Sequence, residues 1–200
     1  PKNWDPSTDF VLDTRNPEVI TAGTFTEFLN SPDQFYYQVL YKQNPDDGQE
    51  NVPGNIYSQI DSTRYTPNPN LSLKLQKIIP PFEIVKHKFV KPVVIQSNYL
   101  TEFSGRPRYL RASVLLPSSF FDHPEKSYPI CYRVPGLNGR YDGVNGMMRN
   151  KDFTDWWFSG NAPQIIYVFM DSQGPYGDTY LVDSENNGPC GKALTEELIP

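Results

Sequence analysis

The sequence predicts an α/β domain that follows a β-rich, sandwich-like accessory domain. Two short, nearly unbroken apolar runs, at 130–134 and 165–170, are typical of strands that helices cover on both faces. A helical pattern at 151–158 separates them, and strands that alternate with helices define the α/β class. The first part of the chain shows strand patterns alone. We therefore expect an accessory domain at 1–81 and an α/β domain at 82–200.

Each element of the accessory domain has a local signal. The aromatic and β-branched run at 35–42 is typical of a half-buried strand. Leucines alternate with polar residues over 71–76, which predicts a second strand with one solvent-facing side. Between them, residues 44–54 are rich in Pro, Asp and Gly and predict a long, turn-forming loop. The pair Pro80–Pro81 cannot continue a strand ladder or a helix, so it marks the domain boundary.

The α/β domain begins with two predicted strands, at 89–97 and 108–117. In the second of these, alternate apolar residues share one face of the sheet. The helix at 151–158 is expected to end at Gly160, because glycine commonly terminates helices. A further helix is expected to begin near Lys192.

The end of the sequence shapes the functional expectation. The chain stops at Pro200, where a parallel sheet is expected to continue with another strand. No Gly-x-Ser-x-Gly motif, which marks a nucleophile turn, occurs in the 200 residues. We therefore expect an incomplete α/β domain whose strand at 165–171 has an open edge.

Composition limits the classes of partner. The formal net charge of -5 and the pI near 5.0 argue against nucleic acid, because no basic stripe could neutralise phosphates. No run approaches the ~20 apolar residues of a membrane span. The content of 20 prolines and 13 tyrosines favours a loop-rich, extracytoplasmic protein. No spacing of ligand residues predicts a metal or another cofactor.

Cys131 and Cys190 are the only cysteines in the sequence. Cys131 lies in a predicted buried strand, where a free thiol packs as a small hydrophobic group. A disulfide between the two is the alternative in an oxidising compartment, because the sequence does not fix the distance between their Cα atoms.

A glycine turn follows the first apolar run. The segment Val134-Pro-Gly-Leu-Asn-Gly139 lies at the carboxyl end of the predicted strand, where open α/β sheets bind ligands. Such a turn can aim a backbone N–H at a developing oxyanion, a contact worth roughly 10²–10³ in turnover. An ordinary glycine-containing connection is the alternative, since such turns are common.

A long polar, glycine-rich segment at 171–191 follows the other apolar run. Both loops should leave the sheet at one edge, where this segment would form a pocket wall. Its aspartates, Asp171, Asp178 and Asp183, are too widely spaced for a calcium loop and are better interpreted as solvated or helix-capping residues. The predicted pocket-lining residues of the two loops are Gly136, Asn138, Asp171, Asp183, Ser184 and Asn187.

Other reactive side chains have simpler interpretations. Ser172 and Ser184 lack the strand-Ser-helix turn of a nucleophile and are expected to be hydrogen-bonding turn residues. His87 and His123 lie in polar stretches, and nothing in the sequence orients either one as the base of a catalytic triad.

From Arg106 onward, the order of features resembles a group of α/β-hydrolases that includes enterochelin esterases, feruloyl esterases and esterase D-like enzymes. Further upstream, short stretches look like the β-domain that precedes the hydrolase core in a bacterial branch of this group. The order of the stretches, rather than a single motif, carries the resemblance. The matching stretches are Gly54–Ser58, Ile78–Pro81, Arg111–Pro117, Ser127–Gly136, Ile165–Asp171 and Asn187–Pro200.

The resemblance implies a secreted or periplasmic serine esterase that works through an acyl-enzyme. Leu137, directly after Gly136, would donate its backbone N–H to the oxyanion hole. The family's Ser, Asp/Glu and His would follow in that order beyond Pro200, so this chain alone is expected to be inactive. Its expected partners are a small-molecule ester and the remaining part of its own domain. Family members often carry an aromatic residue at the position of Cys190 and His or Asp at that of Pro135, and these departures bear on pocket shape and substrate class.

Two other functions remain open at this point. A non-catalytic module would bind carbohydrate or a partner protein through aromatic strands, with Tyr36, Tyr41, Tyr57 and Tyr65 as its candidates. A degenerate hydrolase would keep the scaffold as an interaction platform. A Gly-x-Ser-x-Gly motif downstream of this sequence would favour the esterase, whereas a stop codon there would favour the binding module.

Overall fold

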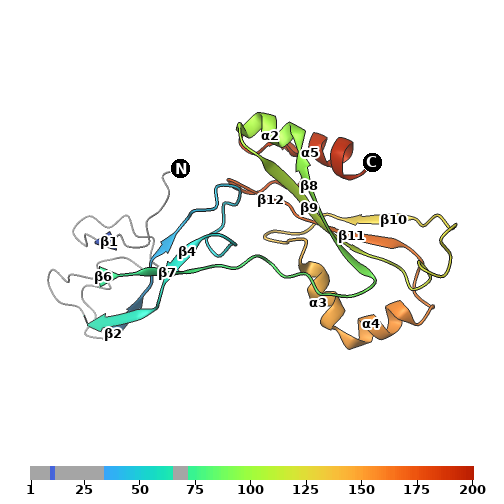
Figure 1. The fold of residues 1–200 in the computed structure, drawn as a ribbon, viewed down its shortest axis with the longest axis horizontal. Helices are drawn as coiled ribbons and strands as arrows, with labels where there is room; N and C mark the ends of the chain where they lie inside the picture. The colour runs from blue at the N-terminus through green and yellow to red at the C-terminus, as the bar shows by residue number, and fades with distance from the viewer. Residues whose placement is uncertain (1–9, 12–33, 65–71) are drawn as a thin grey trace. The chain divides into compact units, whose positions relative to one another are not determined.

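The chain divides into two compact units in a computed structural model, which describes residues 10–11, 34–64 and 72–200 (Figure 1). The first unit comprises residues 1–44 and 50–81, and the second comprises 45–49 and 82–200. The second unit resumes at Phe82, directly after the Pro80–Pro81 pair at which the sequence predicts a domain boundary. Segment 45–49 is a departure from the expected division, because a short piece of the predicted loop belongs to the second unit. Tyr65 and Leu71 lie outside the described residues.

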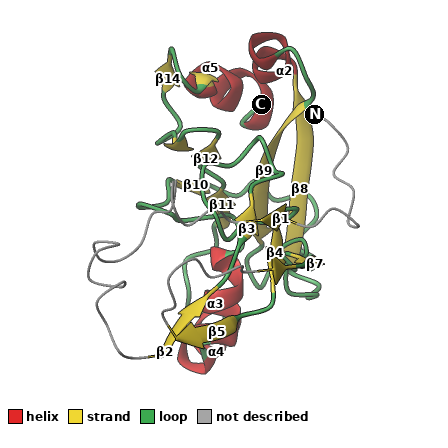
Figure 2. Cartoon of the chain, turned by 90° about the vertical axis from the view of Figure 1, so that its left-hand side faces the viewer, coloured by secondary structure: helices red, strands yellow, loops and turns green. Residues whose placement is uncertain are grey.

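The first unit contains short antiparallel strands grouped in three small sheets within the described residues (Figure 2). The predicted strand at 35–42 is interrupted at Gln38 and Val39, where the Val39 N–H donates to Ser58 Oγ at 3.1 Å. The sandwich-like arrangement stays a prediction. The paired strands are β1 (Phe10–Val11) with β6 (Ser72–Leu73), β2 (Gln34–Tyr37) with β5 (Asp61–Arg64), and β3 (Leu40–Tyr41) with β4 (Ile56–Ser58) and β7 (Leu75–Ile78).

The second unit is an α/β unit built on one four-stranded mixed sheet (Figure 1). Its strand order is β10-β11-β9-β8. β10 and β11 run parallel, whereas β9 is antiparallel to both β11 and β8. The strands are β8 (Val90–Ser97), β9 (Arg108–Leu115), β10 (Ile130–Arg133) and β11 (Ile166–Met170).

The helices of this unit begin at side-chain caps where the sequence provides them. Ser97 Oγ accepts from the Leu100 N–H at 3.1 Å and Asn150 Oδ1 accepts from the Phe153 N–H at 3.1 Å, which satisfies amides that a helix leaves unpaired. The predicted helix at 151–158 is confirmed. The helices are α2 (Asn98–Ser104), α3 (Gly143–Arg149), α4 (Lys151–Phe158) and α5 (Cys190–Ala193), and α5 continues into one π-helical turn, η1 (Leu194–Leu198).

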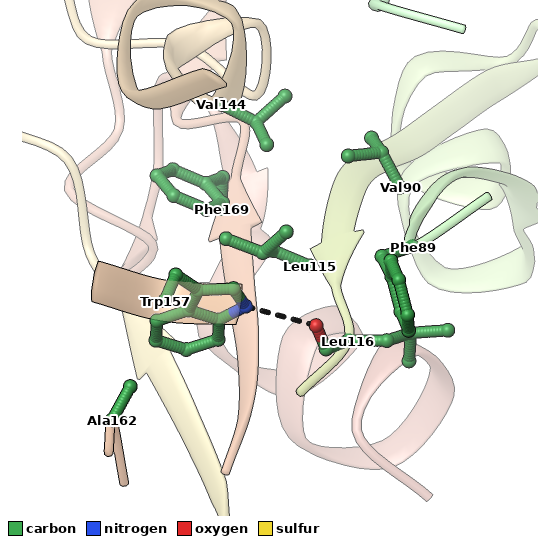
Figure 3. Packing of buried hydrophobic residues seen from close by; sticks show 8 residues of the cluster. All are labelled: Phe89, Val90, Leu115, Leu116, Val144, Trp157, Ala162 and Phe169. Atoms are coloured by element: carbon green, nitrogen blue, oxygen red, sulfur yellow. Dashed lines mark hydrogen bonds between the residues drawn. The ribbon is translucent and has the colours of Figure 1, made fainter. Parts of the chain in front are cut away.

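Helices α3 and α4 cover one face of the sheet (Figure 3). Phe169 and Leu115 of the sheet pack in one buried cluster with Val144 of α3 and Trp157 of α4. Trp157 also donates its indole N–H to the Leu116 carbonyl at 3.0 Å, so this large side chain is buried without an unpaired polar atom.

The segment around η1 covers the opposite face. Val168 and Met170 of β11 pack there with Ala112 of β9, Leu181 and Leu194. Because neighbouring residues of a strand point to opposite faces, Val168 and Met170 lie on one side of β11 and Phe169 on the other. β11 is therefore buried on both faces, as its apolar sequence predicts.

The expected position of the open edge is wrong. The run at 165–171 was predicted to be the open edge, but β11 lies between β10 and β9 and is paired on both sides. β10 and β8 are the two edge strands of this sheet, and β10 is largely exposed. Cys131 of β10 is accordingly exposed rather than buried, whereas Cys190 is buried, and both cysteines are free. None of the described helices is long and apolar enough to cross a membrane.

Candidate functional site

The carboxyl ends of β10 and β11 mark the candidate site. These strands are parallel neighbours, so the loops that follow them leave the sheet at the same edge. The chain then passes from β10 to α3, on one face, and from β11 to α5 and η1, on the other (Figure 1). Adjacent connections that diverge to opposite faces create a crevice between them, where open α/β sheets bind ligands.

The loop after β10 contains a tight turn at Gly136–Gly139. The Gly139 N–H donates to the Gly136 carbonyl at 2.8 Å, and Asn138, the third residue of the turn, has φ of +62°. A positive φ at that position is the feature of a type II turn, which favours Gly or Asn there. Leu137 is 72 % exposed, and its N–H has no acceptor among the residues that the structure describes. This amide is therefore a free backbone donor at the turn.

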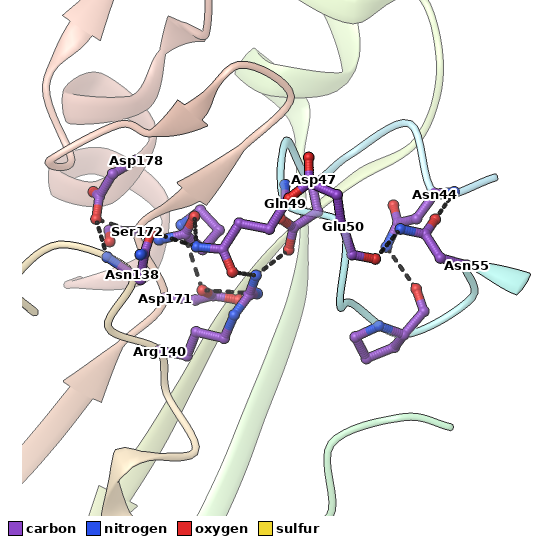
Figure 4. A network of polar contacts seen from close by, with 12 residues as sticks. Asn44, Asp47, Gln49, Glu50, Asn55, Asn138, Arg140, Asp171, Ser172 and Asp178 are labelled. Carbon is purple, nitrogen blue, oxygen red and sulfur yellow. Dashed lines mark hydrogen bonds and ion pairs between the residues drawn. The ribbon is translucent and has the colours of Figure 1, made fainter. Parts of the chain in front are cut away.

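Asp178 connects the two loops. One of its carboxylate oxygens, Oδ2, accepts from the Asn138 N–H at 3.2 Å and from Gln173 Nε2 at 3.3 Å (Figure 4). Its other oxygen accepts from the Tyr180 N–H at 3.0 Å. Asp178 was expected to be solvated or to cap a helix, whereas its hydrogen bonds hold the turn after β10 against the hairpin after β11. This hairpin consists of β12 (Gln173–Gly174) and β13 (Gly177–Asp178).

Asp171 is the most perturbed acid of the site. Its side chain is 10 % exposed, and burial raises its pKa from 3.8 to about 6, because desolvation disfavours the charged form. Arg140, whose Nη1 lies 3.9 Å from Asp171 Oδ1, and the Gln173 N–H oppose this rise. Perturbed acids near a crevice are typical of functional sites. Among the predicted pocket-lining residues that the structure describes, Asp171 alone is a largely buried acid with a shifted pKa.

Arg140 is the central cation of the arrangement. It donates to Asp47 Oδ2 at 2.5 Å, and its guanidinium lies over the Phe82 ring at 5.0 Å from the centroid. Arg140 and Asp47 are 9 % and 8 % exposed, so each charge is compensated within the protein. Sequence reasoning missed both residues. The only available signal was the acidic composition of the predicted loop at 44–54.

A small cavity lies behind Asp171. It has a volume of about 20 Å³, and Arg108, Thr179 and Cys190 line it together with Asp171. Burial raises the pKa of the Cys190 thiol, which keeps the thiol neutral near pH 7. The volume is close to that of a single water molecule, so the cavity cannot admit a substrate.

Three predicted pocket-lining residues lie on the next hairpin, formed by β14 (Asp183–Ser184) and β15 (Gly188–Pro189). Asp183 Oδ1 accepts from the Lys192 N–H at 2.9 Å, and Ser184 Oγ accepts from the Asn187 N–H at 3.0 Å. Asn187 Oδ1 accepts from the Tyr176 N–H at 3.3 Å. These contacts organise the hairpin and its neighbours, and a pocket-lining role for the three residues stays a prediction.

Ser172 is buried directly behind the turn. Its hydroxyl lies 3.5 Å from the Gly139 carbonyl, to which it donates, and its own carbonyl accepts from the Thr179 N–H at 2.8 Å. These are the contacts of a hydrogen-bonding turn residue, as the sequence predicts, and they leave the hydroxyl without a base among its described partners.

The two histidines lie in other surroundings. The His87 ring is 5.3 Å from the Phe158 ring, between centroids, and His123 Nδ1 is 3.7 Å from a carboxylate oxygen of Glu125. His87 also borders a shallow groove of about 630 Å³ beside α4, and no residue of the two site loops lines this groove. Within the described residues, no group of acids, histidines and cysteines is arranged to hold a metal ion.

The aromatic candidates of the alternative binding module lie in the first unit. Tyr36 is 72 % exposed, whereas Tyr41 and Tyr57 are half-buried in the small sheets. A binding role for these tyrosines stays a prediction.

No protein-family model and no curated protein matches this chain. The chemistry of the site therefore rests on its geometry.

Proposed function

We propose that residues 82–200 form the N-terminal part of the sheet of a secreted or periplasmic serine ester hydrolase. In this proposal the Leu137 N–H is one donor of the oxyanion hole. The remaining donor, the nucleophilic serine, its base and the orienting acid lie outside this sequence.

The sheet topology supports the proposal. The parallel pair β10 and β11 follows the antiparallel strand β9 along the chain, and mixed sheets of this kind are common in α/β folds. One oxyanion donor of the α/β-hydrolase fold comes from the loop between its third strand and the following helix. β10 is the third strand of the sheet along the chain, and α3 is the helix that follows it.

The free Leu137 N–H carries the proposal. A catalytic donor must be available to the developing charge and fixed before the reaction begins. The Gly139-to-Gly136 hydrogen bond and the Asp178 contact to Asn138 fix the turn, while the Leu137 N–H has no acceptor among the described residues. These contacts give a fixed, uncommitted donor beyond the carboxyl end of β10.

The reaction assigned to this site is acyl transfer to water. A serine hydroxyl attacks the ester carbonyl, and the carbonyl oxygen becomes an oxyanion that the Leu137 N–H stabilises. Collapse of this intermediate expels the alcohol and leaves an acyl-enzyme, which water hydrolyses. Asp171 takes no part in proton transfer in this scheme. Its carboxylate lies 3.9 Å from Arg140 Nη1.

A fluorophosphonate probe, which labels activated serines, tests the proposal. We expect labelling of a form extended beyond Pro200 by the downstream coding sequence, at a serine in the added part, and no labelling of the 200-residue chain. Labelling of Ser172 or Ser184 in the 200-residue chain would contradict the proposal, as would an extended form that neither reacts nor hydrolyses p-nitrophenyl acetate.

A matched pair of glycine variants in the extended form tests the donor itself. A Cβ at Gly139 would lie 2.5 Å from the Pro135 Cβ and 2.9 Å from the Gly136 carbonyl oxygen, so G139A must distort the turn. A Cβ at Gly146 meets nothing within 4 Å. We expect G139A to reduce kcat by roughly 10²–10³, the effect of one lost oxyanion donor, and G146A to leave kcat within about twofold of the parent.

A further inference from the structure

The segment Pro45–Gln49, called the strap below, belongs to the second unit although the residues on both sides of it belong to the first. Its position in the second unit is anchored at two points. Asp46 pairs with Arg106 and lies 3.1 Å from Arg108 Nε, at the start of β9. The Gly48 N–H donates to the Gly174 carbonyl in the β12–β13 hairpin at 2.8 Å.

Between these anchors, Asp47 reaches the turn after β10. It is the nearest carboxylate to Arg140, at 2.5 Å, while Asp171 lies at 3.9 Å. Arg140 is almost fully buried, so its charge depends on these carboxylates for compensation. Without Asp47, the only carboxylate contact left to the guanidinium among the described residues would be the longer one to Asp171, and the turn residues next to Arg140 would gain freedom to move toward water.

Gln49 adds a second contact to the same turn. Its side-chain oxygen accepts from Arg140 Nη2 at 3.2 Å, and its Nε2 donates to Asn138 Oδ1 at 2.5 Å (Figure 4). Asn138 is the residue that adopts positive φ, a conformation that needs support from its surroundings in a non-glycine residue. The strap therefore contacts the turn at both Asn138 and Arg140.

We propose that the strap positions the Gly136–Arg140 turn, with Asp47 as a positioning residue that acts through Arg140. The consequence for catalysis, a correctly placed Leu137 N–H, rests on the proposed function. The effect of the strap on the position of the turn does not depend on catalysis and can be measured in the folded 200-residue chain. A segment 89 residues before Asn138 in the sequence thus supplies part of the site.

Gly48 provides a test that removes no polar group. A Cβ at Gly48 would lie 2.5 Å from the Gly177 nitrogen and 3.0 Å from the Pro175 carbonyl oxygen. Both contacts are with backbone, so G48A must displace the strap from the hairpin. G146A is the matched control, because the same methyl group meets nothing within 4 Å in α3.

Amide hydrogen exchange by NMR on the folded 200-residue chain measures the effect. The reporters are the Asn138 and Gly139 amides, which donate to Asp178 and Gly136. We expect D47N and G48A each to accelerate exchange at these two amides at least tenfold, and G146A to change it less than twofold. Acceleration below twofold in both D47N and G48A would overturn the proposal. Equal acceleration in G146A would overturn it as well.

The pKa of Asp171 gives a readout that general loosening of the fold would not produce. The groups around its carboxylate are Arg140 and Arg111, which lower the pKa, and Asp47, which raises it. D47N removes the repulsion and leaves Arg140 to Asp171, so the pKa should fall below about 6. D47E, which keeps the charge, should restore both the pKa and the exchange rates. An unchanged or higher pKa in D47N would overturn the assignment.

The two proposals can fail separately. Slow exchange in D47N and G48A, together with serine labelling of the extended form, would remove the strap's role and leave the esterase. Fast exchange in these variants, with an extended form that does not react, would leave the strap and remove the esterase.

Discussion

β10 and β11 are both short, mainly apolar strands, but they differ in how many strands they pair with and in how deeply they are buried. Both are short apolar runs that precede a loop of the candidate site, and they lie side by side in parallel. β11 is paired on both edges and buried on both faces, whereas β10 is an exposed edge strand. The loop after β11 accordingly starts with the largely buried acid Asp171, and the loop after β10 presents the exposed Leu137.

This difference teaches that an apolar run predicts a strand but not its place in the sheet. The place depends on strand order, which depends on pairings between residues that are far apart in the sequence. Because β11 is buried and β10 is exposed, the loops that follow these two strands present different chemical groups at the site. The loop after β11 supplies buried charge, and the loop after β10 supplies an accessible backbone donor.

The largest expected effect comes from truncating the centre of β11. Phe169 is 2 % exposed and packs in the cluster with Leu115 and Trp157, so F169A should lower the free energy of unfolding by about 3–5 kcal/mol. Ile130 of β10 is 49 % exposed, and I130A should lower it by less than about 1 kcal/mol. Urea denaturation followed by tryptophan fluorescence measures both. Equal losses in the two variants would show that β10 is not an edge strand.

Asp171 should destabilise the folded protein near neutral pH. Its folded-state pKa of about 6 exceeds the unfolded value of 3.8, so the stability contributed by the protonated form is complete below pH 3.8 and is lost as pH rises through about 6. D171N stays neutral at all pH values. It should therefore match the wild type near pH 3.5 and exceed its free energy of unfolding by as much as about 3 kcal/mol at pH 7.

The control for D171N is D155N, because Asp155 is exposed and pairs with Lys151 within one turn of α4. D155N should change the free energy of unfolding by less than about 0.5 kcal/mol. A D171N protein that is less stable than wild type at pH 7 would show that the carboxylate, despite its burial, is held favourably by Arg140.

Smaller effects are expected within the turn after β10. The Cβ of G139A would meet Pro135 and the Gly136 carbonyl, so this variant should lose about 1–3 kcal/mol in free energy of unfolding. G136A should lose much less, because a Cβ at Gly136 meets nothing within 4 Å. Thermal unfolding of the two variants at matched concentration separates them. The reverse order of stability would refute the turn geometry.

The smallest effect concerns the positive φ of Asn138. A β-branched residue in this conformation is strained, so N138V should cost about 1–2 kcal/mol in free energy of unfolding. N138G tolerates the same φ and should be the more stable of the two, although both variants lose the contact with Gln49. The comparison of these variants isolates backbone strain from the lost hydrogen bond.

Local signals predicted much of the sheet and its main helix. The strands β8, β9, β10 and β11 lie within two residues of their predicted ends, and α4 has the predicted bounds. These elements have periodic or unbroken apolar patterns that do not depend on distant partners.

Two helices of the described residues were missed for different physical reasons. α2 carried readable signals, because Ser97 caps its start and Gly105, with φ of +66°, ends it. α3 contains two glycines in seven residues and forms against its intrinsic propensity, so packing of residues such as Val144 must stabilise it.

The sequence predicted the two loops of the candidate site but not the side-chain contacts that join them. The glycine turn and the position of Asp171 follow from two strands that end at one sheet edge. The Asp47–Arg140 pair joins residues 93 positions apart, and no local pattern encodes such a contact. The free edge was misplaced for the same reason, because strand order is a long-range property.

Titration of the Asp171 carboxyl carbon by NMR, in the wild type and in R140Q, tests most directly whether the two strands bring their loops together. Arg140 comes from the loop after β10 and lowers the pKa of Asp171, which follows β11. We predict a pKa of about 6 in the wild type and a higher value in R140Q. A wild-type pKa near 3.8, or a value that R140Q leaves unchanged, would contradict the assembled site.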